Sequence, residues 1–266
     1  MALSIASQKP GMLILVSRTK AKIEAVANQI AVSFPDVLVR TVLVDLGSQK
    51  SIRQAAQEVA GIASKIDILI NNAAVMVPER HVTEDGIEQQ FGTNHIGPFL
   101  FTNLLMDQIK AAAKNNTPGS TRIVNVTSAG HRISPIRFND YNFEGKPLPQ
   151  DEEPTSGLPP SFFVPGQTYS GFLAYGQCKT ANTDLSRNLN DETRKVIDKT
   201  GDFWKSQDQG AATMLVAAFD PALNKPSGHY LSDCQIVSPA PHASDPKVAD
   251  RLWHLSEELV GQTFGL

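Results

Sequence analysis

Short apolar runs alternate with longer segments of helical periodicity along the first half of the chain. Continuous apolar runs of this length are typical of strands buried on both faces of a sheet. The longer segments repeat apolar residues three and four positions apart, as amphipathic helices do. This alternation predicts an α/β fold with a doubly wound parallel sheet that helices cover on both faces. The expected strands are Met12–Val16, Val37–Val44, Ile66–Ile70 and Arg122–Val126, and the expected helices are Ala21–Val32, a Ser48-capped helix through Ala60, and Thr83–Ala113.

Residues 131–170 interrupt this alternation with a segment rich in proline, glycine and aromatic residues. A loop of this length inside a compact domain is usually functional or disordered. Its aromatic part, Pro160–Phe172, therefore has two interpretations, an apolar lid over a substrate pocket or a surface excursion. Beyond it we expect a helix starting near Gln209, a last strand over His229–Val237 and a last helix over Lys247–Val260. No linker divides the chain, so residues 1–266 are expected to form one domain.

The composition narrows the class of protein. The chain has 266 residues, a formal net charge of −3, 41% hydrophobic and 19% charged residues. No block of basic residues suggests nucleic acid or an anionic membrane as a partner. No apolar run reaches the roughly 18 residues of a membrane span, and the first residues do not resemble a secretory signal. Cys178 and Cys234 make neither a disulfide framework nor a metal cluster, so we expect a reducing, cytoplasmic setting and no metal.

Polar residues stand at the ends of three expected strands, where ligand sites of open parallel sheets lie. They are Asp45, the pair Asn71-Asn72, and Ser128. Asp45 is suited to hydrogen-bond an adenine amine, or alternatively to start the next helix. Asn72 is suited to contact a nucleotide, or to form a turn. Ser128 is suited to donate a hydrogen bond to a substrate oxygen, or to cap a loop. Because all of them stand at strand ends, a shared ligand site is favoured over separate structural roles.

Tyr175 and Lys179 form a further candidate pair. Residues four apart lie on the same face of a helix. The ammonium group of Lys179 would there favour the phenolate of Tyr175, which makes this phenol a general acid/base for an alcohol or carbonyl. By itself the spacing is a weak signal, and the alternative is a surface pair without a function.

Four motifs in order resemble the short-chain dehydrogenase/reductase family, and the similarity extends from about residue 1 to the C-terminus. They are L-I-N-N-A-A (residues 69–74), F-G-T-N-H-I-G-P-F (91–99), R-I-V-N-V-T-S (122–128) and Y-G-Q-C-K (175–179). Later segments, among them P-A-P-H-A-S-D-P (239–246), are similar to fungal members near the retinol dehydrogenase and WW-domain oxidoreductase branch.

This resemblance implies a Rossmann-like sheet and four catalytic residues. Tyr175 would exchange a proton with the substrate oxygen, and Lys179 would lower the Tyr175 pKa and hold the nicotinamide ribose. Ser128 would polarise the carbonyl, and Asn94 would anchor a proton-relay water. The bound cofactor delivers the hydride, while the protein supplies position and charge.

The resemblance also implies a nicotinamide cofactor. A basic residue after the strand that reads the adenosine 2′-position suits the 2′-phosphate of NADP(H), and an acidic one suits NAD(H). Arg18 and Lys20 follow the first visible strand, and no carboxylate lies between Val16 and Ile23, so we predict NADP(H). The alternative is that Arg18 only lies in solvent. The expected cofactor contacts are Arg18, Asp45, Leu46, Asn72, Ala73, Tyr175, Lys179 and Thr183.

The chain departs from the family pattern at two places. The family begins with a strand and the turn T-G-x-x-x-G-x-G, which holds the pyrophosphate, and this sequence lacks both. We expect the chain to begin inside the following helix. A strand and a P-G-x-x-x-T turn after the Tyr-Lys helix are also lacking, with Thr183 as the remnant of that turn. Because a missing strand leaves neighbours about 10 Å apart, the sheet must either close up or leave two edges unpaired.

We therefore expect an NADP(H)-dependent oxidoreductase that interconverts a carbonyl and an alcohol on a small lipophilic or secondary-metabolite-like substrate. The alternative is an inactive relative with at most a binding role, which the missing glycine-rich turn favours. A hydrolase that uses Ser128 is a distant third hypothesis, since no histidine or aspartate placement indicates a triad. The oligomeric state stays open, with a homo-oligomer as one alternative.

Overall fold

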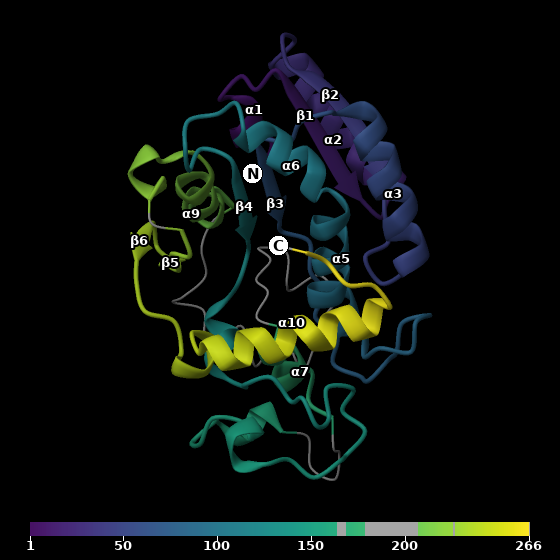
Figure 1. The fold of residues 1–266 in the computed structure, drawn as a ribbon, viewed down its shortest axis with the longest axis vertical. Helices are drawn as coiled ribbons and strands as arrows, with labels where there is room; N and C mark the ends of the chain where they lie inside the picture. Colours follow the sequence, from purple (N-terminus) through teal and green to yellow (C-terminus); the bar gives the residue numbers. More distant parts are fainter. Residues whose placement is uncertain (164–168, 179–206, 226, 266) are drawn as a thin grey trace.

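The fold contains two pairs of parallel strands, one near the middle of the molecule and one towards its upper right in the view (Figure 1). The computed structural model describes residues 1–163, 169–178, 207–225 and 227–265. Strand β1 (Met12–Ser17) pairs with β2 (Leu38–Leu43), and β3 (Ile68–Asn71) pairs with β4 (Arg122–Asn125). All four begin and end within two residues of the predicted bounds.

The two pairs form separate sheets within these described ranges. The sheet has therefore not closed up, and β1 and β3 are not hydrogen-bonded to each other. The prediction that the first strand is buried on both faces was wrong. Met12 is exposed, and the remaining residues of β1 and all residues of β3 are only half-buried. Successive β1 side chains do pack on opposite faces, but a strand pair without a further neighbour shields each face incompletely.

Helices flank both strand pairs. Ser48 caps α3 as predicted, since its hydroxyl oxygen accepts a hydrogen bond from the amide of Ser51. The α-helices are α1 (Ala2–Ala6), α2 (Lys20–Ser33), α3 (Gln49–Ile62), α4 (Gln89–Phe91), α5 (Gly97–Leu104), α6 (Met106–Ala113), α7 (Gly171–Cys178), α9 (Gln207–Phe219) and α10 (Pro246–Val260). The π-helix η1 (Gly92–Ile96) joins α4 to α5, and the 3₁₀-helices include η2 (Ala129–Arg132), η3 (Gln150–Glu152), η4 (Pro160–Phe162), η7 (Pro221–Leu223) and η8 (Pro241–Ala243).

The helix predicted from Thr83 begins only at Gln89. The residues before it form a tight turn, in which Gly86 adopts a positive φ of 75° and the amide of Thr83 donates to the carbonyl of Ile87. The carboxylate of Glu88 then caps α4. Turn formation and capping therefore outweigh the apolar periodicity that runs through this segment.

The single strand predicted over His229–Val237 is instead a short antiparallel hairpin. Strand β5 (Leu231–Ser232) pairs with β6 (Gln235–Ile236). The two residues between them, Asp233 and Cys234, have φ values of 52° and 64°. Consecutive left-handed residues are what a two-residue hairpin turn requires, so the chain reverses there.

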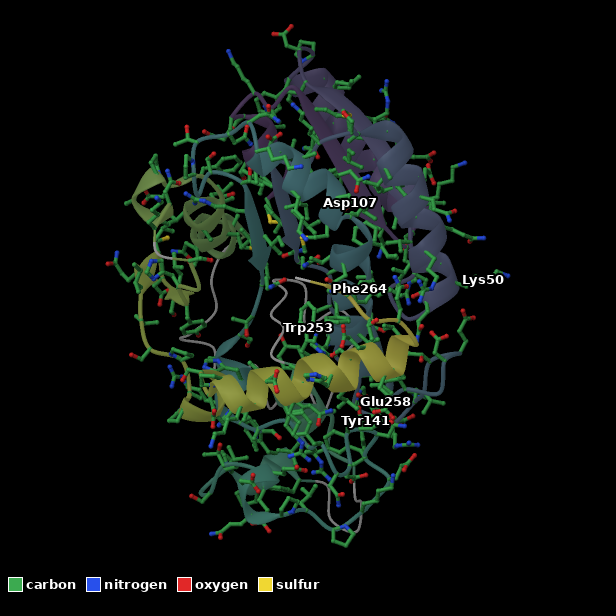
Figure 2. All side chains as sticks on the ribbon, viewed as in Figure 1. Lys50, Asp107, Tyr141, Trp253, Glu258 and Phe264 are labelled. Carbon is green, nitrogen blue, oxygen red and sulfur yellow. The ribbon has the colours of Figure 1, made fainter. Side chains whose placement is uncertain are left out.

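Helix α10 crosses the molecule between the strand ends and the insertion at residues 131–163 (Figure 1). Its Trp253 packs edge-on against Phe99, with ring centroids 5.0 Å apart. On the insertion side, Arg251 forms an ion pair with the buried Glu152 and lies over the ring of Phe138. Trp253 and Phe264 lie on the α5 side of α10, and Glu258 is exposed (Figure 2). The described part of the insertion is therefore tied to the main core.

Candidate active site

Ser128 follows β4 and starts η2. It is half-buried, and its hydroxyl oxygen accepts a hydrogen bond from the amide of Gly130 at 3.0 Å. This is the loop-capping geometry that the sequence offered as the alternative. An accepted hydrogen bond leaves the hydroxyl proton available, so capping and donation to a substrate oxygen are compatible.

Tyr175 lies on α7 directly against this loop. Its side chain is 3% exposed and packs against Met76 and Phe172. A Cβ atom on Gly130 would stand 3.1 Å from two ring carbons of Tyr175, and one on Gly176 would stand 2.9 Å from the Gly130 carbonyl oxygen. Two glycines therefore allow α7 to approach η2 closely and bring Tyr175 to the Ser128 loop.

Asn94 is buried in η1 and holds the segment that follows β3. Its Oδ1 atom accepts from the amide of Val75, and its Nδ2 atom donates to the carbonyl of Val75, both at 2.8 Å. A π-helical turn widens the helix and is frequent at functional sites. The side-chain amide is thus used to fix Val75, and this places the adjacent Met76 against Tyr175.

The turn after β2 contacts the continuous helical segment formed by η1 and α5. Asp45 accepts a hydrogen bond from the amide of Gly47 on its Oδ1 atom, as a helix-initiating turn does, while its Oδ2 atom has no partner among the described residues. The carbonyl of Leu46 lies directly against Gly97 at the start of α5. The predicted cofactor residues Asp45 and Leu46 are therefore linked to the helix that carries Asn94.

Arg18, Asn72 and Ala73 lie at strand ends as expected. Arg18 is exposed beyond β1 and forms no ion pair within the described ranges. Asn72 is half-buried and Ala73 is exposed, directly after β3. Arg18 belongs to one strand pair and Asn72 to the other, and no contact between them is seen. The remaining predicted residues, Lys179 and Thr183, lie outside the part of the chain that the structure describes.

The sequence model of the family described as short chain dehydrogenase matches residues 1–142, which is more than half of the chain. The chain belongs to this family. Human retinol dehydrogenase 13 is 33% identical over 274 residues, covering 96% of this chain and 78% of its own length. An oxidoreductase named fscI from Fusarium equiseti is 39% identical over 181 residues, covering 67% of this chain and 69% of its own. Both relatives confirm the resemblance deduced from the motifs.

A solved structure agrees with the fold class. A putative uncharacterized protein from Mycobacterium paratuberculosis superimposes with a TM-score of 0.63 at 25% sequence identity, covering 99% of this chain and 90% of that one. The α/β, Rossmann-like class predicted for the chain is thereby confirmed.

The structure contains a buried polar network that the sequence did not indicate. The Glu88 carboxylate is fully buried and accepts hydrogen bonds from the amides of Gln90 and Phe91 and from the hydroxyl of Tyr169 at 2.9 Å. Burial raises the pKa of Glu88 above its usual value, although these hydrogen bonds oppose the shift. Burial also raises the pKa of the Tyr169 hydroxyl. Glu88 thereby joins the insertion to the helix leading to Asn94.

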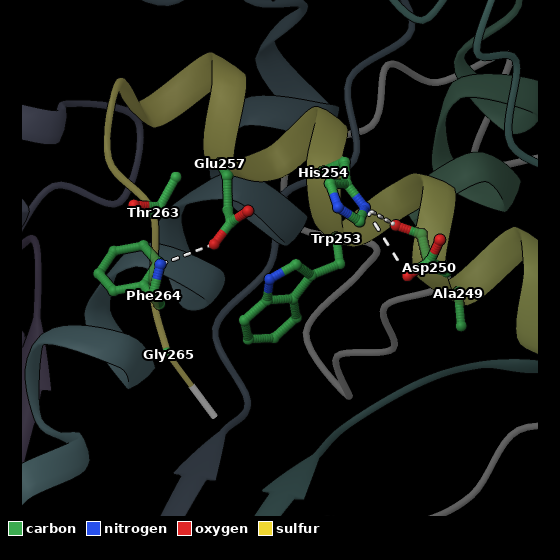
Figure 3. Close-up of a pocket in the computed structure, with 8 residues that line it drawn as sticks. All are labelled: Ala249, Asp250, Trp253, His254, Glu257, Thr263, Phe264 and Gly265. Atoms are coloured by element: carbon green, nitrogen blue, oxygen red, sulfur yellow. Dashed lines mark hydrogen bonds and ion pairs between the residues drawn. The ribbon is translucent and has the colours of Figure 1, made fainter.

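An open depression of about 750 Å³ lies beside α10 (Figure 3). Trp253 and Phe264 line it, together with Asp250, His254 and Glu257. The carbonyl and carboxylate of Asp250 raise the pKa of His254. None of the predicted catalytic or cofactor residues that the structure describes lines this depression, so it is not assigned to the reaction.

Among the residues that the structure describes, no helix has both the length and the apolar character of a membrane span. The same residues include no group of three or more acidic, histidine or cysteine side chains placed to hold a metal ion. Cys178 is buried and Cys234 half-buried, and neither forms a disulfide within the described residues.

Proposed function

We propose that this chain is an NADP(H)-dependent oxidoreductase that interconverts a carbonyl and an alcohol on a small lipophilic or secondary-metabolite-like substrate. The observation that supports the proposal is the packing of Tyr175 against the Ser128 loop. This packing is possible because Gly130 and Gly176 have no side chains and let α7 approach η2 closely. A phenol and a hydroxyl held at the carboxyl end of a parallel strand are suited to bind one substrate oxygen between them.

Each residue has a defined part in the proposed reaction. The Ser128 hydroxyl donates a hydrogen bond to the substrate oxygen, and Tyr175 gives or takes its proton. The apolar side chains of Met76 and Phe172 pack against the ring of Tyr175. We propose Lys179 as the cation that stabilises the phenolate during proton transfer. Asn94 keeps Met76 in place through Val75.

The residues that are described fit the adenosine half of NADP(H). Arg18 is exposed at the end of β1 and suits a 2′-phosphate, and the free Oδ2 atom of Asp45 suits an amine donor. Asn72 and Ala73 follow β3, where a nucleotide would pass. When bound, the nicotinamide supplies or accepts the hydride. NADP(H) rather than NAD(H), together with a cytoplasmic location, remains part of the proposal.

A non-catalytic relative is the second candidate. It is favoured by the separation of β1 and β3 into different sheets within the described ranges. Such a protein would retain at most a binding role.

Titration of the purified chain with NADPH, followed by cofactor fluorescence, distinguishes the two candidates. Saturable binding is expected for the oxidoreductase, and no binding at millimolar NADPH would contradict it. The Tyr175→Phe variant should then bind NADPH with unchanged affinity but lose turnover of lipophilic ketones and aldehydes, which is followed at the nicotinamide absorbance. Substantial turnover in this variant would show that Tyr175 is not the acid/base.

A further inference from the structure

The imidazole of His131 bridges two segments of the chain that are 109 residues apart. The side chain is 2% exposed. Its Nδ1 atom lies 2.6 Å from the carbonyl oxygen of Ser128, and its Nε2 atom lies 3.0 Å from the amide nitrogen of Ala240. A carbonyl oxygen only accepts and a backbone amide only donates. The ring is therefore neutral, with its proton on Nδ1 and its lone pair on Nε2.

Further contacts join the same two segments. Arg132 donates from Nη2 to the carbonyl of Ser238 at 2.8 Å, and His242 donates from Nε2 to the carbonyl of His131 at 2.8 Å. The ring of Tyr230 packs edge-on against His131, with centroids 5.1 Å apart. These contacts hold the segment Ser238–His242 against η2, the 3₁₀-helix whose N-cap residue is Ser128.

These contacts between η2 and the segment Ser238–His242 affect the proposed site because the Ser128 loop is closely packed. The Gly130 backbone is in contact distance of the Tyr175 ring on one side, and its amide donates to the Ser128 hydroxyl on the other. A small rotation of η2 would change the position of Ser128 relative to Tyr175. Sub-ångström errors in the placement of reacting groups reduce rates strongly.

We propose that His131 is a positioning residue, which holds the Ser128 loop in its reactive geometry by joining it to the segment Ser238–His242. The inference rests on the proposed oxidoreductase function. It also gives a role to part of the P-A-P-H-A-S-D-P motif, because Ala240 and His242 belong to it. His131 itself does not contact the substrate in this proposal.

Three substitutions separate the two hydrogen bonds of the ring. His131→Asn keeps an amide donor near the Ser128 carbonyl and loses the acceptor for Ala240. His131→Gln places a carbonyl oxygen near the Ala240 amide and loses the donor to Ser128. His131→Phe keeps the ring shape and loses both. The exposed His81 provides a matched control as His81→Gln, for which wild-type values are expected.

The expected result is a decrease in kcat without a matching change in the KM for NADPH. Loss of both bonds in His131→Phe should lower kcat about tenfold or more, and His131→Asn should recover most of this because it keeps the bond to Ser128. Equal kcat in all three variants and wild type would overturn the proposal. So would a loss that His131→Asn does not rescue, because a purely structural role predicts no such order.

Amide hydrogen exchange supplies a readout that does not depend on turnover. Peptides covering residues 128–132 and 238–242 should exchange faster in His131→Phe, while those covering β1 and β2 should not change. If the wild-type chain binds NADPH but reduces no substrate, the proposed function fails. The exchange data then still test whether His131 holds the Ser128 loop against the segment Ser238–His242. Unchanged exchange in both segments would overturn the inference even in an active enzyme.

Discussion

The close approach of α7 to η2 leads to a prediction about Gly176. An added methyl group at this position would lie 2.9 Å from the carbonyl oxygen of Gly130 and 3.2 Å from both Cβ of Ile133 and the amide nitrogen of Ser134. Two of these three neighbours are backbone atoms, which cannot rotate away. Gly176→Ala must therefore push α7 off η2 by several tenths of an ångström or strain the loop.

The free-energy change combines two opposing terms. Replacing glycine by alanine in a helix stabilises it by about 1 kcal/mol, and overpacking costs about 1–3 kcal/mol. Gly61 in α3 isolates the first term, because a Cβ atom there meets nothing within 4 Å. We expect Gly61→Ala to be stabilising by up to ~1 kcal/mol, and Gly176→Ala to be about 1–3 kcal/mol less stable than Gly61→Ala.

Urea denaturation of both variants, followed by far-ultraviolet circular dichroism, measures this difference. In a domain of this size, each kcal/mol corresponds to about 2–4 °C in Tm, so thermal scans give an independent check. Gly176→Ala should also lower kcat, since Tyr175 moves with the helix. If Gly176→Ala were as stable as Gly61→Ala, the close packing of α7 on η2 would be refuted.

Two further predictions concern the buried Glu88 and the half-buried Arg122. Because the pKa of Glu88 is raised above 4.5 in the fold, the folded chain binds more protons, and its free energy of unfolding relative to Glu88→Gln should fall as pH rises from 4.5 through the folded pKa. Urea titrations across this range would contradict the assignment if that difference rose. Arg122 donates to the carbonyls of Ala217 and Asp220 at 2.8 and 2.6 Å, so Arg122→Met should destabilise the chain by about 2–4 kcal/mol. The exposed Arg40→Met is the control, with a change within about 0.5 kcal/mol expected in thermal scans; equal effects of the two would contradict the role of Arg122.

The sequence was most informative where the structure is local. The first four predicted strands and the helices α2, α3 and α10 match the structure within two residues at each end, since apolar periodicity and the Ser48 cap act over a few positions. Local turns were harder to predict. The reversal at Asp233 and Cys234 and the turn at Gly86 depend on left-handed residues that periodicity does not reveal.

The sequence predicted those site residues that belong to recognisable motifs. Ser128, Asn94 and Tyr175 were named from their motifs, and the family assignment is confirmed. Their exact roles stay predictions. Gly176 lies inside one of these motifs and Gly130 lies two residues after another, but nothing in their spacing showed that they face each other across two helices.

The amino-acid sequence by itself determined the order of strands and helices, the family and the residues of the proposed chemistry, because these follow from short-range patterns. Tertiary structure alone decided which distant groups meet. Tyr169 bonds Glu88 across 81 residues, and His131 meets the amide of Ala240. It also decided that the strand pairs of β1 and β3 remain separate within the described ranges. Such pairings depend on how whole elements pack, so no local pattern along the chain encodes them.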